Sequence, residues 1–228
     1  MTVAKPNWIW LSHSTNIRTP AYGNGIGFKL KQDKDQSKGA SCNQVFFSMP
    51  NHLGSHVDAP KHFFKEAKSI NEYKPEDWIF EKPFLIDLSS KKNEIVNIEC
   101  FNLQDHYDPD VDLILIKTGI EKYRGEDKFW KKSPIFDPTI CSYLLEKYPS
   151  MKAIGIDAIS ISSLQNRELG RSIHRAFLSK DIRIFEDLSL KDISIMESLE
   201  MVIALPFRFD NADGAPSSVI AQINVNYD

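Results

Sequence analysis

This chain has few cysteines and little net charge. Its three cysteines are odd in number, widely spaced and free of any Cys-x-x-Cys pair: Cys42, Cys100 and Cys141. This pattern does not fit a disulfide framework and is typical of free thiols in a reducing compartment. The 28 basic and 31 acidic residues leave a net charge of -3, so we expect no nucleic-acid partner and no anionic lipid surface.

Long apolar runs are missing as well. No stretch approaches the roughly 18 apolar residues of a membrane span, and the first ten residues show no apolar core of a signal peptide. We therefore expect a cytoplasmic protein with no membrane partner. With 42% hydrophobic residues and 14 phenylalanines, the chain is apolar enough to fold as one domain over residues 1–228.

Short apolar runs predict a chain rich in strands. We expect strands at residues 8–11, 44–48, 84–88, 113–117, 153–156, 182–185, 201–207 and 219–225. A helix is predicted from Pro138 to about Lys147, with Asp137 as its cap, and a second helix from about Ser172. Because strands and helices do not alternate strictly, the sequence predicts an α/β fold with a mixed, partly antiparallel sheet.

Two segments look like connections. The polar stretch at residues 29–41 (KLKQDKDQSKGAS) has no hydrophobic periodicity, so we predict a mobile loop there. A lid over a binding site is the alternative, because long loops are often functional. The glycine-rich residues 23–27 predict a turn and not a nucleotide-binding loop, since no helical pattern follows them.

Three of the six histidines fall within eleven residues, in the segment His52-Leu-Gly-Ser-His56-Val-Asp58-Ala-Pro-Lys-His62. If residues 56–58 are extended, side-chain alternation puts His56 and Asp58 on one face, and Gly54 lets a turn bring His52 to them. Two imidazoles and a carboxylate suit zinc or manganese, and such a set with open positions is typical of catalysis. His62 is then a further ligand or a proton-transfer group. The alternative is that each histidine is satisfied separately in turns and core.

The same segment resembles the hallmark of the metal-dependent cyclase or kynurenine formamidase-like hydrolases, a family that includes isatin hydrolase. That hallmark reads His-x-Gly-Thr-His-x-Asp-x-Pro-x-His-Phe, and Ser55 is the only departure here. Further resemblance covers most of the chain, at residues 10–13, 19–22, 116–119, 155–157, 172–178, 184–188 and 213–216. It implies a single α/β domain of the swivelling β/β/α type and a homodimer or homotetramer.

The resemblance also implies the roles of individual residues. His52, His56 and Asp58 correspond to ligands of one divalent ion. Asp58, His174 and Glu186 correspond to ligands of a second ion in dinuclear members, with Glu186 touching both ions. A hydroxide on the metal would attack a carbonyl with His62 as general acid/base, which a histidine of near-neutral pKa is able to do. The implied activity is hydrolysis of a small amide or cyclic amide.

Within this class, an arylformamidase acting on N-formylkynurenine is the leading hypothesis. Opening of an isatin-like cyclic amide, lactone hydrolysis, a biosynthetic cyclase or dehydratase, and a protein that binds metal or ligand without catalysis are the alternatives. Trp10, Tyr22 and Phe63 are candidates to bind the substrate, although core packing is the commoner role of aromatic side chains.

Two departures from the family bear on the substrate. Many members have Asp where Ser162 stands, and many have Arg near the position of Ser218. A missing Arg removes a fixed partner for a substrate carboxylate. We predict that His13 makes a local hydrogen bond outside the site and that His106 is solvated. Nucleophilic Cys or Ser catalysis is disfavoured, because Cys42 has no activating neighbour in sequence and no Gly-x-Ser-x-Gly occurs.

Overall fold

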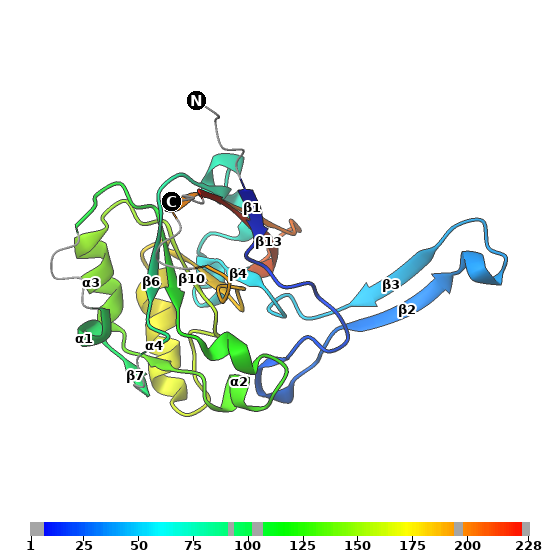
Figure 1. Ribbon diagram of the computed structural model, residues 1–228, viewed down its shortest axis with the longest axis horizontal. Coiled ribbons are helices and arrows are strands. Elements are labelled where there is room, and N and C mark those ends of the chain that lie inside the picture. Colours follow the sequence, from blue (N-terminus) through cyan, green and yellow to red (C-terminus); the bar gives the residue numbers. More distant parts are fainter. Residues whose placement is uncertain (1–6, 91–93, 102–106, 194–197, 225–228) are drawn as a thin grey trace.

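A large mixed sheet forms the centre of the computed structural model, which describes residues 7–90, 94–101, 107–193 and 198–224 (Figure 1). It has nine strands. Eight of them follow the order β5 (Ile79–Phe80), β12 (Ser198–Pro206), β13 (Gly214–Asn224), β4 (His56–Asp58), β11 (Arg183–Glu186), β10 (Ala153–Ile156), β8 (Leu113–Lys117) and β6 (Pro83–Asp87), while β1 (Asn7–Trp10) pairs with β13.

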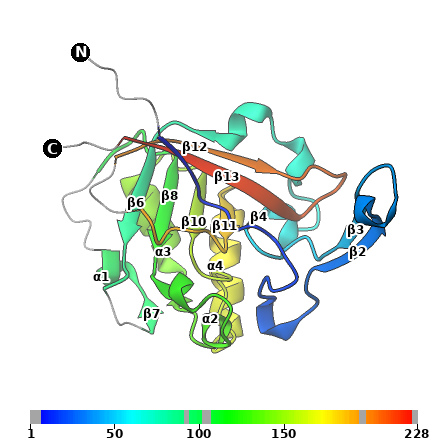
Figure 2. The same cartoon turned by 45° about the vertical axis from the view of Figure 1, so that its right-hand side comes forward.

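The half of the sheet made of β6, β8, β10 and β11 is parallel, and its inner strands β8, β10 and β11 are buried on both faces. Along β8, Ile114 and Ile116 face one apolar cluster, whereas Leu113 and Leu115 face the other. Helices α3 (Thr139–Lys147) and α4 (Arg167–Leu178) pack on the first face (Figure 2). Burial on both faces explains why these strands read as continuous apolar runs.

The other half of the sheet is antiparallel. β13 is long enough to pair with β12 along most of its length, with β1 near its end, and with β4 at its start. β4 therefore joins the two halves, because its other edge pairs antiparallel with β11. The prediction of a mixed α/β fold with a partly antiparallel sheet is confirmed.

Short elements connect these layers. They are the parallel pair β7 (Ile95–Val96) and β9 (Ile135–Phe136), the helical turns α1 (Ile98–Phe101) and α2 (Lys128–Lys131), and six 3₁₀ turns: η1 (Tyr22–Asn24), η2 (Gln36–Lys38), η3 (Pro60–His62), η4 (Ile70–Glu72), η5 (Pro75–Trp78) and η6 (Ile120–Tyr123). The turn predicted at residues 23–27 is present, with Gly23 in the left-handed region at φ 63°. None of the three cysteines, all of which lie in the described residues, forms a disulfide, as predicted.

The predicted mobile loop at residues 29–41 is wrong for residues 29–34, which form a strand. β2 (Lys29–Lys34) pairs with β3 (Gln44–Ser48) in an antiparallel hairpin that reaches away from the body, and we call residues 29–48 the arm (Figure 1). Every residue of both strands is exposed. A strand with no face on a core needs no hydrophobic alternation, so the sequence signal for β2 was missing.

Most predicted boundaries agree with the structure, and strands 44–48, 113–117 and 153–156 match residue for residue. The second predicted helix begins earlier than expected, at Arg167, where the Asn166 side chain accepts from the backbone N–H of Leu169. The helix begins with the charged residues Arg167 and Glu168, and its buried apolar side chains start at Ile173. The last predicted strand extends one residue beyond the described chain. Among the described residues, no helix has both the length and the apolar character to cross a membrane.

Candidate metal centre

The site is built on β4, in the middle of the sheet. His56 and Asp58 point to the same side of this strand, as predicted from alternation, while Val57 packs into the core behind them. Their side chains are only 4% and 2% exposed. Gly54 has a φ of 71°, so it makes the turn that brings His52 round to Asp58, where His52 Nδ1 lies 2.7 Å from Asp58 Oδ1.

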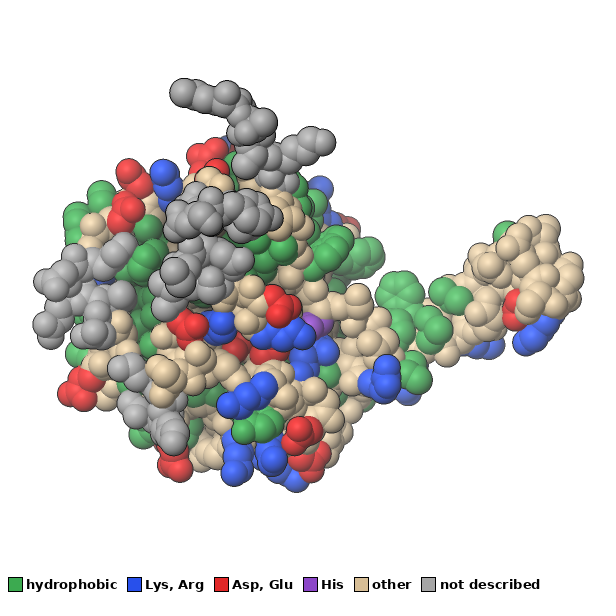
Figure 3. All heavy atoms as spheres, in the orientation of Figure 1, with side chains coloured by type: hydrophobic (Ala, Val, Ile, Leu, Met, Phe, Trp, Pro, Cys, Tyr) green, Lys and Arg blue, Asp and Glu red, His purple; other side chains and the backbone are tan. Residues whose placement is uncertain are grey.

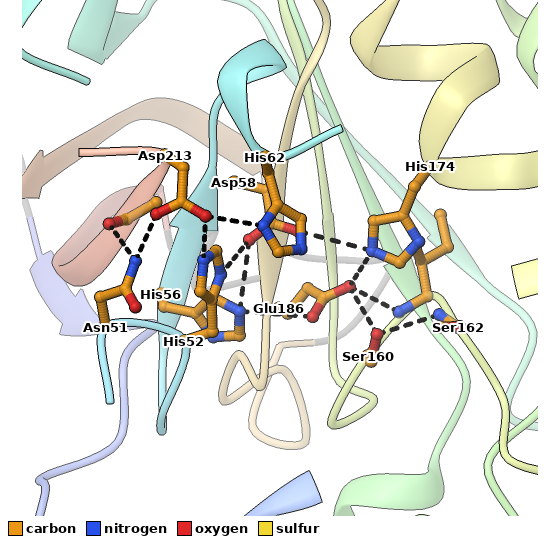
Figure 4. Close-up of polar contacts among 12 residues, drawn as sticks. Asn51, His52, His56, Asp58, His62, Ser160, Ser162, His174, Glu186 and Asp213 are labelled. Atoms are coloured by element: carbon orange, nitrogen blue, oxygen red, sulfur yellow. Dashed lines mark hydrogen bonds and ion pairs between the residues drawn. The ribbon is translucent and has the colours of Figure 1, made fainter. Parts of the chain in front are cut away.

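Two further side chains come from distant parts of the chain (Figure 4). Glu186 lies on β11 directly opposite His56, and His174 projects from α4. His56 Nε2 is 3.5 Å from Asp58 Oδ1 and 3.3 Å from Glu186 Oε2. His174 Nε2 is 3.4 Å from Asp58 Oδ2 and 3.3 Å from Glu186 Oε1. Each carboxylate thus presents one oxygen to His56 and the other to His174.

The two buried imidazoles are oriented by backbone carbonyls. His56 Nδ1 lies 2.8 Å from the Gly54 carbonyl oxygen, and His174 Nδ1 lies 2.7 Å from the Gly170 carbonyl oxygen. Each Nδ1 must donate a proton there, because a carbonyl only accepts. When the rings are neutral, each Nε2 therefore directs a lone pair at the carboxylates, which is the usual arrangement of a metal-ligating histidine.

These donors fit a divalent ion. Bonds of about 2.0–2.1 Å in a tetrahedral arrangement separate neighbouring ligand atoms by about 3.3–3.4 Å. The His56 and His174 Nε2 atoms lie 3.3–3.5 Å from the carboxylate oxygens, whereas His52 Nδ1 lies at the hydrogen-bond distance of 2.7 Å from Asp58. These side chains form two groups, and within each group the ligand atoms lie within 4.8 Å of one another: His52, His56 and Asp58, and Asp58, His174 and Glu186. Buried carboxylates also require a positive partner.

The raised pKa values of two histidines also indicate a site for a cation. Burial alone lowers the pKa of His174, but its contacts with Asp58 and Glu186 raise that pKa to about 10. Burial also opposes the shift at His52, and hydrogen bonds to Asp213 and Asp58 nevertheless raise the pKa of His52 to about 10. The carboxylates thus draw protons onto the imidazoles, and a bound cation would replace those protons.

One end of the cluster is open to solvent. His62 follows Pro60 in η3, and its side chain is 29% exposed; that of His52 is 22% exposed. The two rings lie with their centroids 4.1 Å apart. Asp213, in the turn between β12 and β13, contacts both of them, 3.0 Å from His52 Nε2 and 2.8 Å from His62 Nδ1. A substrate would reach the donors from this side.

Glu186 accepts two hydrogen bonds from the loop that follows β10. The Ser160 hydroxyl donates to Glu186 Oε1 at 3.0 Å, and the Ile161 N–H donates to the same oxygen at 2.7 Å. The next residue, Asp187, has a φ of 53° and is 1% exposed. The Arg124 guanidinium donates to both of its carboxylate oxygens at 2.8 Å. This buried ion pair fixes the end of β11.

The three aromatic candidates lie in different places. Phe63 stacks on His174, with ring centroids 4.8 Å apart. Tyr22 lies beside Ser162, and burial raises the pKa of Tyr22. Trp10 is 67% exposed and lines a separate hollow of about 560 Å³ that also includes Ser218. None of the predicted metal and proton-transfer residues lines that hollow.

Sequence reasoning missed Asp213 as a site residue. It lies 161 positions from His52, and its only local signal is a carboxylate in a turn before Gly-Ala-Pro. His13 lies away from the donors, 3.4 Å from Glu121, and burial lowers the pKa of His13 to about 4. His106 lies outside the described residues.

Comparisons with known proteins agree with this geometry. Residues 9–163 match the family described as putative cyclase. A kynurenine formamidase of Geobacillus thermodenitrificans is 28% identical over 211 residues, which span 92% of this chain and 94% of the relative. A kynurenine formamidase of Bacillus cytotoxicus is 27% identical over 217 residues, 93% of this chain and 96% of the relative.

Solved structures share the fold. An isatin hydrolase bound to the product analogue thioisatinate superposes with a TM-score of 0.81 at 16% identity, covering 96% of this chain and 93% of its own. A predicted metal-dependent hydrolase from Bacillus stearothermophilus superposes with a TM-score of 0.73 at 24% identity, covering 96% of this chain and 99% of its own.

Proposed function

The chain belongs to the putative cyclase family, and from that premise we propose that it is a metal-dependent hydrolase of a small aromatic amide or cyclic amide. The observation that carries the proposal is the meeting of three histidines and two carboxylates at one point on the sheet. Four of these five side chains are at most 4% exposed. A purely structural role would not require two buried carboxylates to share the same imidazoles.

We propose zinc or manganese as the metal, in one or two ions. His52, His56 and Asp58 would hold the first ion, and Asp58, His174 and Glu186 the second, with Glu186 reaching both. Each of the two carboxylates directs one oxygen toward His56 and the other toward His174, which supports two positions for metal ions. When bound, such an ion lowers the pKa of a coordinated water toward about 7 and polarises a substrate carbonyl.

His62 supplies the proton transfer in this proposal. It lies at the open end of the cluster, and its Nδ1 is engaged by Asp213, so Nε2 is left to face an incoming substrate. There it takes a proton from the attacking water and returns it to the departing amide nitrogen. Substitution of His62 by Ala should lower kcat by about 100-fold or more while metal content stays near the wild-type value.

Aromatic substrates are favoured by the side chains around the open end. Phe63 lies against His174 and makes an edge contact with His62, with ring centroids 4.9 Å apart. Tyr22 lies beside Ser162 near Glu186. N-formylkynurenine is the leading candidate, supported by the kynurenine formamidase relatives. A cyclic amide is the second candidate, because isatin hydrolases share this fold.

The deciding experiment combines elemental analysis of the purified protein with hydrolysis assays on N-formylkynurenine, isatin and a simple lactone. We expect at least one equivalent of zinc or manganese and turnover that a chelator abolishes and added metal restores. The fastest substrate then selects among arylformamidase, cyclic amidase and lactonase. Metal without turnover would favour a binding protein, and protein that takes up no metal would contradict the proposal.

We also propose that the protein is cytoplasmic and assembles as a homodimer, or as a homotetramer built from two such dimers. The arm carries Leu30, Phe46 and Phe47 at 53–63% exposure, and hydrophobic side chains are visible where it leaves the body (Figure 3). Apolar surface of this kind on a projecting hairpin is typical of an interaction surface. Sedimentation analysis should show an oligomer that Phe46→Ser/Phe47→Ser converts to monomer, whereas Lys31→Ser on the same arm does not.

A further inference from the structure

One carboxylate oxygen contacts two imidazoles at the open end of the site. Asp213 Oδ2 lies 2.8 Å from His62 Nδ1 and 3.0 Å from His52 Nε2 (Figure 4). The other oxygen, Oδ1, accepts a hydrogen bond from the Asn51 side-chain amide at 2.7 Å. The same amide donates to the Gly214 carbonyl oxygen at 3.0 Å, so Asn51 ties the carboxylate to its own turn.

These contacts decide which ring nitrogens carry protons. An ionised carboxylate only accepts hydrogen bonds, so His62 Nδ1 and His52 Nε2 must both donate to Asp213. A neutral His62 then keeps its lone pair on Nε2, the nitrogen of a general base. A neutral His52 keeps its lone pair on Nδ1, which faces Asp58 Oδ1. At 2.7 Å these two atoms lie at hydrogen-bond distance, so without a metal ion a proton must lie between them, and a bound ion would replace that proton.

We propose that Asp213 is a positioning residue that fixes the tautomer and orientation of His62 and His52 together. The catalytic consequence at His62 rests on the proposed function, whereas the tautomers do not. A base whose free nitrogen is set by an orienting carboxylate follows the logic of hydrolytic triads. The Asp213 oxygen would thereby couple the proton-transfer group to a metal ligand through a single atom.

A competing explanation uses the same residues. His52, His62 and Asp213 also lie close enough to hold an ion of their own. Their separations of 2.8 and 3.0 Å are ordinary hydrogen-bond lengths, shorter than the 3.3–3.5 Å between the His56 and His174 Nε2 atoms and the buried carboxylates. An ion there would require a lone pair on His52 Nε2, so that nitrogen could no longer donate to Asp213. An ion held by these three residues would add one equivalent of metal per chain, whereas the positioning role adds none.

Asp213→Asn is the informative variant because Asn51 dictates how the introduced amide lies. The Asn51 amide donates toward the position of Oδ1, so the oxygen of the introduced amide should turn to Asn51 and its NH₂ group should turn to the histidines. That NH₂ donates to His62 Nδ1 and forces the proton onto Nε2, the wrong tautomer for a base. Removing the anchor with Asn51→Ala frees the introduced amide to turn back.

The experiment uses the zinc-loaded full-length protein and its Asp213→Asn, Asn51→Ala and Asn51→Ala/Asp213→Asn variants, with Asp210→Asn in the same turn as the matched control. Asp210 is exposed. Imidazole ¹⁵N NMR should show His62 protonated at Nδ1 in the wild type and at Nε2 in Asp213→Asn. At saturating metal, kcat of Asp213→Asn should fall by about 100-fold with KM changed less than about threefold, and zinc affinity should fall by about 10–100-fold.

The double variant separates positioning from loss of structure. Positioning predicts that Asn51→Ala restores about tenfold of the kcat lost in Asp213→Asn, whereas independent structural damage predicts additive losses. The inference is overturned if Asp213→Asn keeps the wild-type tautomer or kcat, or if it loses a full equivalent of zinc. If the wild type hydrolyses no tested amide, the proposed function fails, yet the ¹⁵N signals still decide the positioning role.

Discussion

We expect substitution of Arg124, which forms an ion pair with buried Asp187 behind the site, to destabilise the fold strongly. Its guanidinium makes two hydrogen bonds of 2.8 Å to Asp187, the residue that follows Glu186 on β11. Asp187 is 1% exposed, whereas Arg124 is 16% exposed. Arg124→Met keeps most of the side-chain volume and removes both donors, so a buried carboxylate is left without its partner.

The cost follows from burial. Breaking a buried ion pair by removing one partner costs about 3–5 kcal/mol, against about 0–1 kcal/mol for an exposed pair. Arg124 is partly exposed, so water can reach the space that Met leaves, and we expect a loss near the lower limit, about 3 kcal/mol. That is a large part of the about 5–15 kcal/mol that stabilises an ordinary domain.

Urea denaturation of the metal-free protein measures this loss directly. Lys122→Met, an exposed position close by in the chain, is the matched control and should change the free energy of unfolding by less than about 0.5 kcal/mol. Arg124→Met/Asp187→Asn removes the stranded charge and should recover part of the loss. A loss below about 1 kcal/mol for Arg124→Met, or a double variant no more stable than the single, would refute the reasoning.

Three further predictions follow from the structure. Burial raises the pKa of Asp157 from 3.8 to about 6, although hydrogen bonds from Thr118 lower it. The stability that the protonated Asp157 contributes is therefore present below pH 3.8 and is lost as the pH rises to about 6. Urea denaturation should show that Asp157→Asn gains about 3 kcal/mol relative to wild type between pH 4 and 7. A Cβ at Gly214 would lie 2.3 Å from His52 Cε1 and 2.8 Å from the Val57 carbonyl oxygen, so Gly214→Ala should weaken zinc binding by about 10–100-fold in a competition titration. Chelator treatment should lower Tm by several degrees, and added zinc should restore it, because metal binding stabilises only the folded state.

The aromatic candidates show where local reasoning stops. Tyr22, Phe63 and Trp10 looked equivalent in the sequence, since each is an aromatic residue near a family motif. The structure puts Phe63 against His174 and Tyr22 beside Ser162, but leaves Trp10 exposed over a separate hollow. Which strand end lies beside which loop depends on sheet order, and no local pattern encodes that order. Their roles in substrate binding stay predictions.

The sequence by itself determined the local geometry of the first motif. Alternation along residues 56–58 put His56 and Asp58 on one face, and Gly54 supplied the left-handed turn before them. The buried strands could be read from apolar runs because both of their faces are covered. β2 of the arm could not be read in this way, because its polar residues pack on no core, whereas its partner β3 was predicted from an apolar run.

Only the tertiary structure decided which distant groups join that motif. β11 pairs with β4 and places Glu186 opposite His56, and the turn after β12 places Asp213 between His52 and His62. Residue spacing reports periodicity within one element, whereas these meetings depend on hydrogen bonding between strands far apart in the chain. The family resemblance named Glu186 and His174 in advance; the orienting contact of Asp213 came from the fold alone.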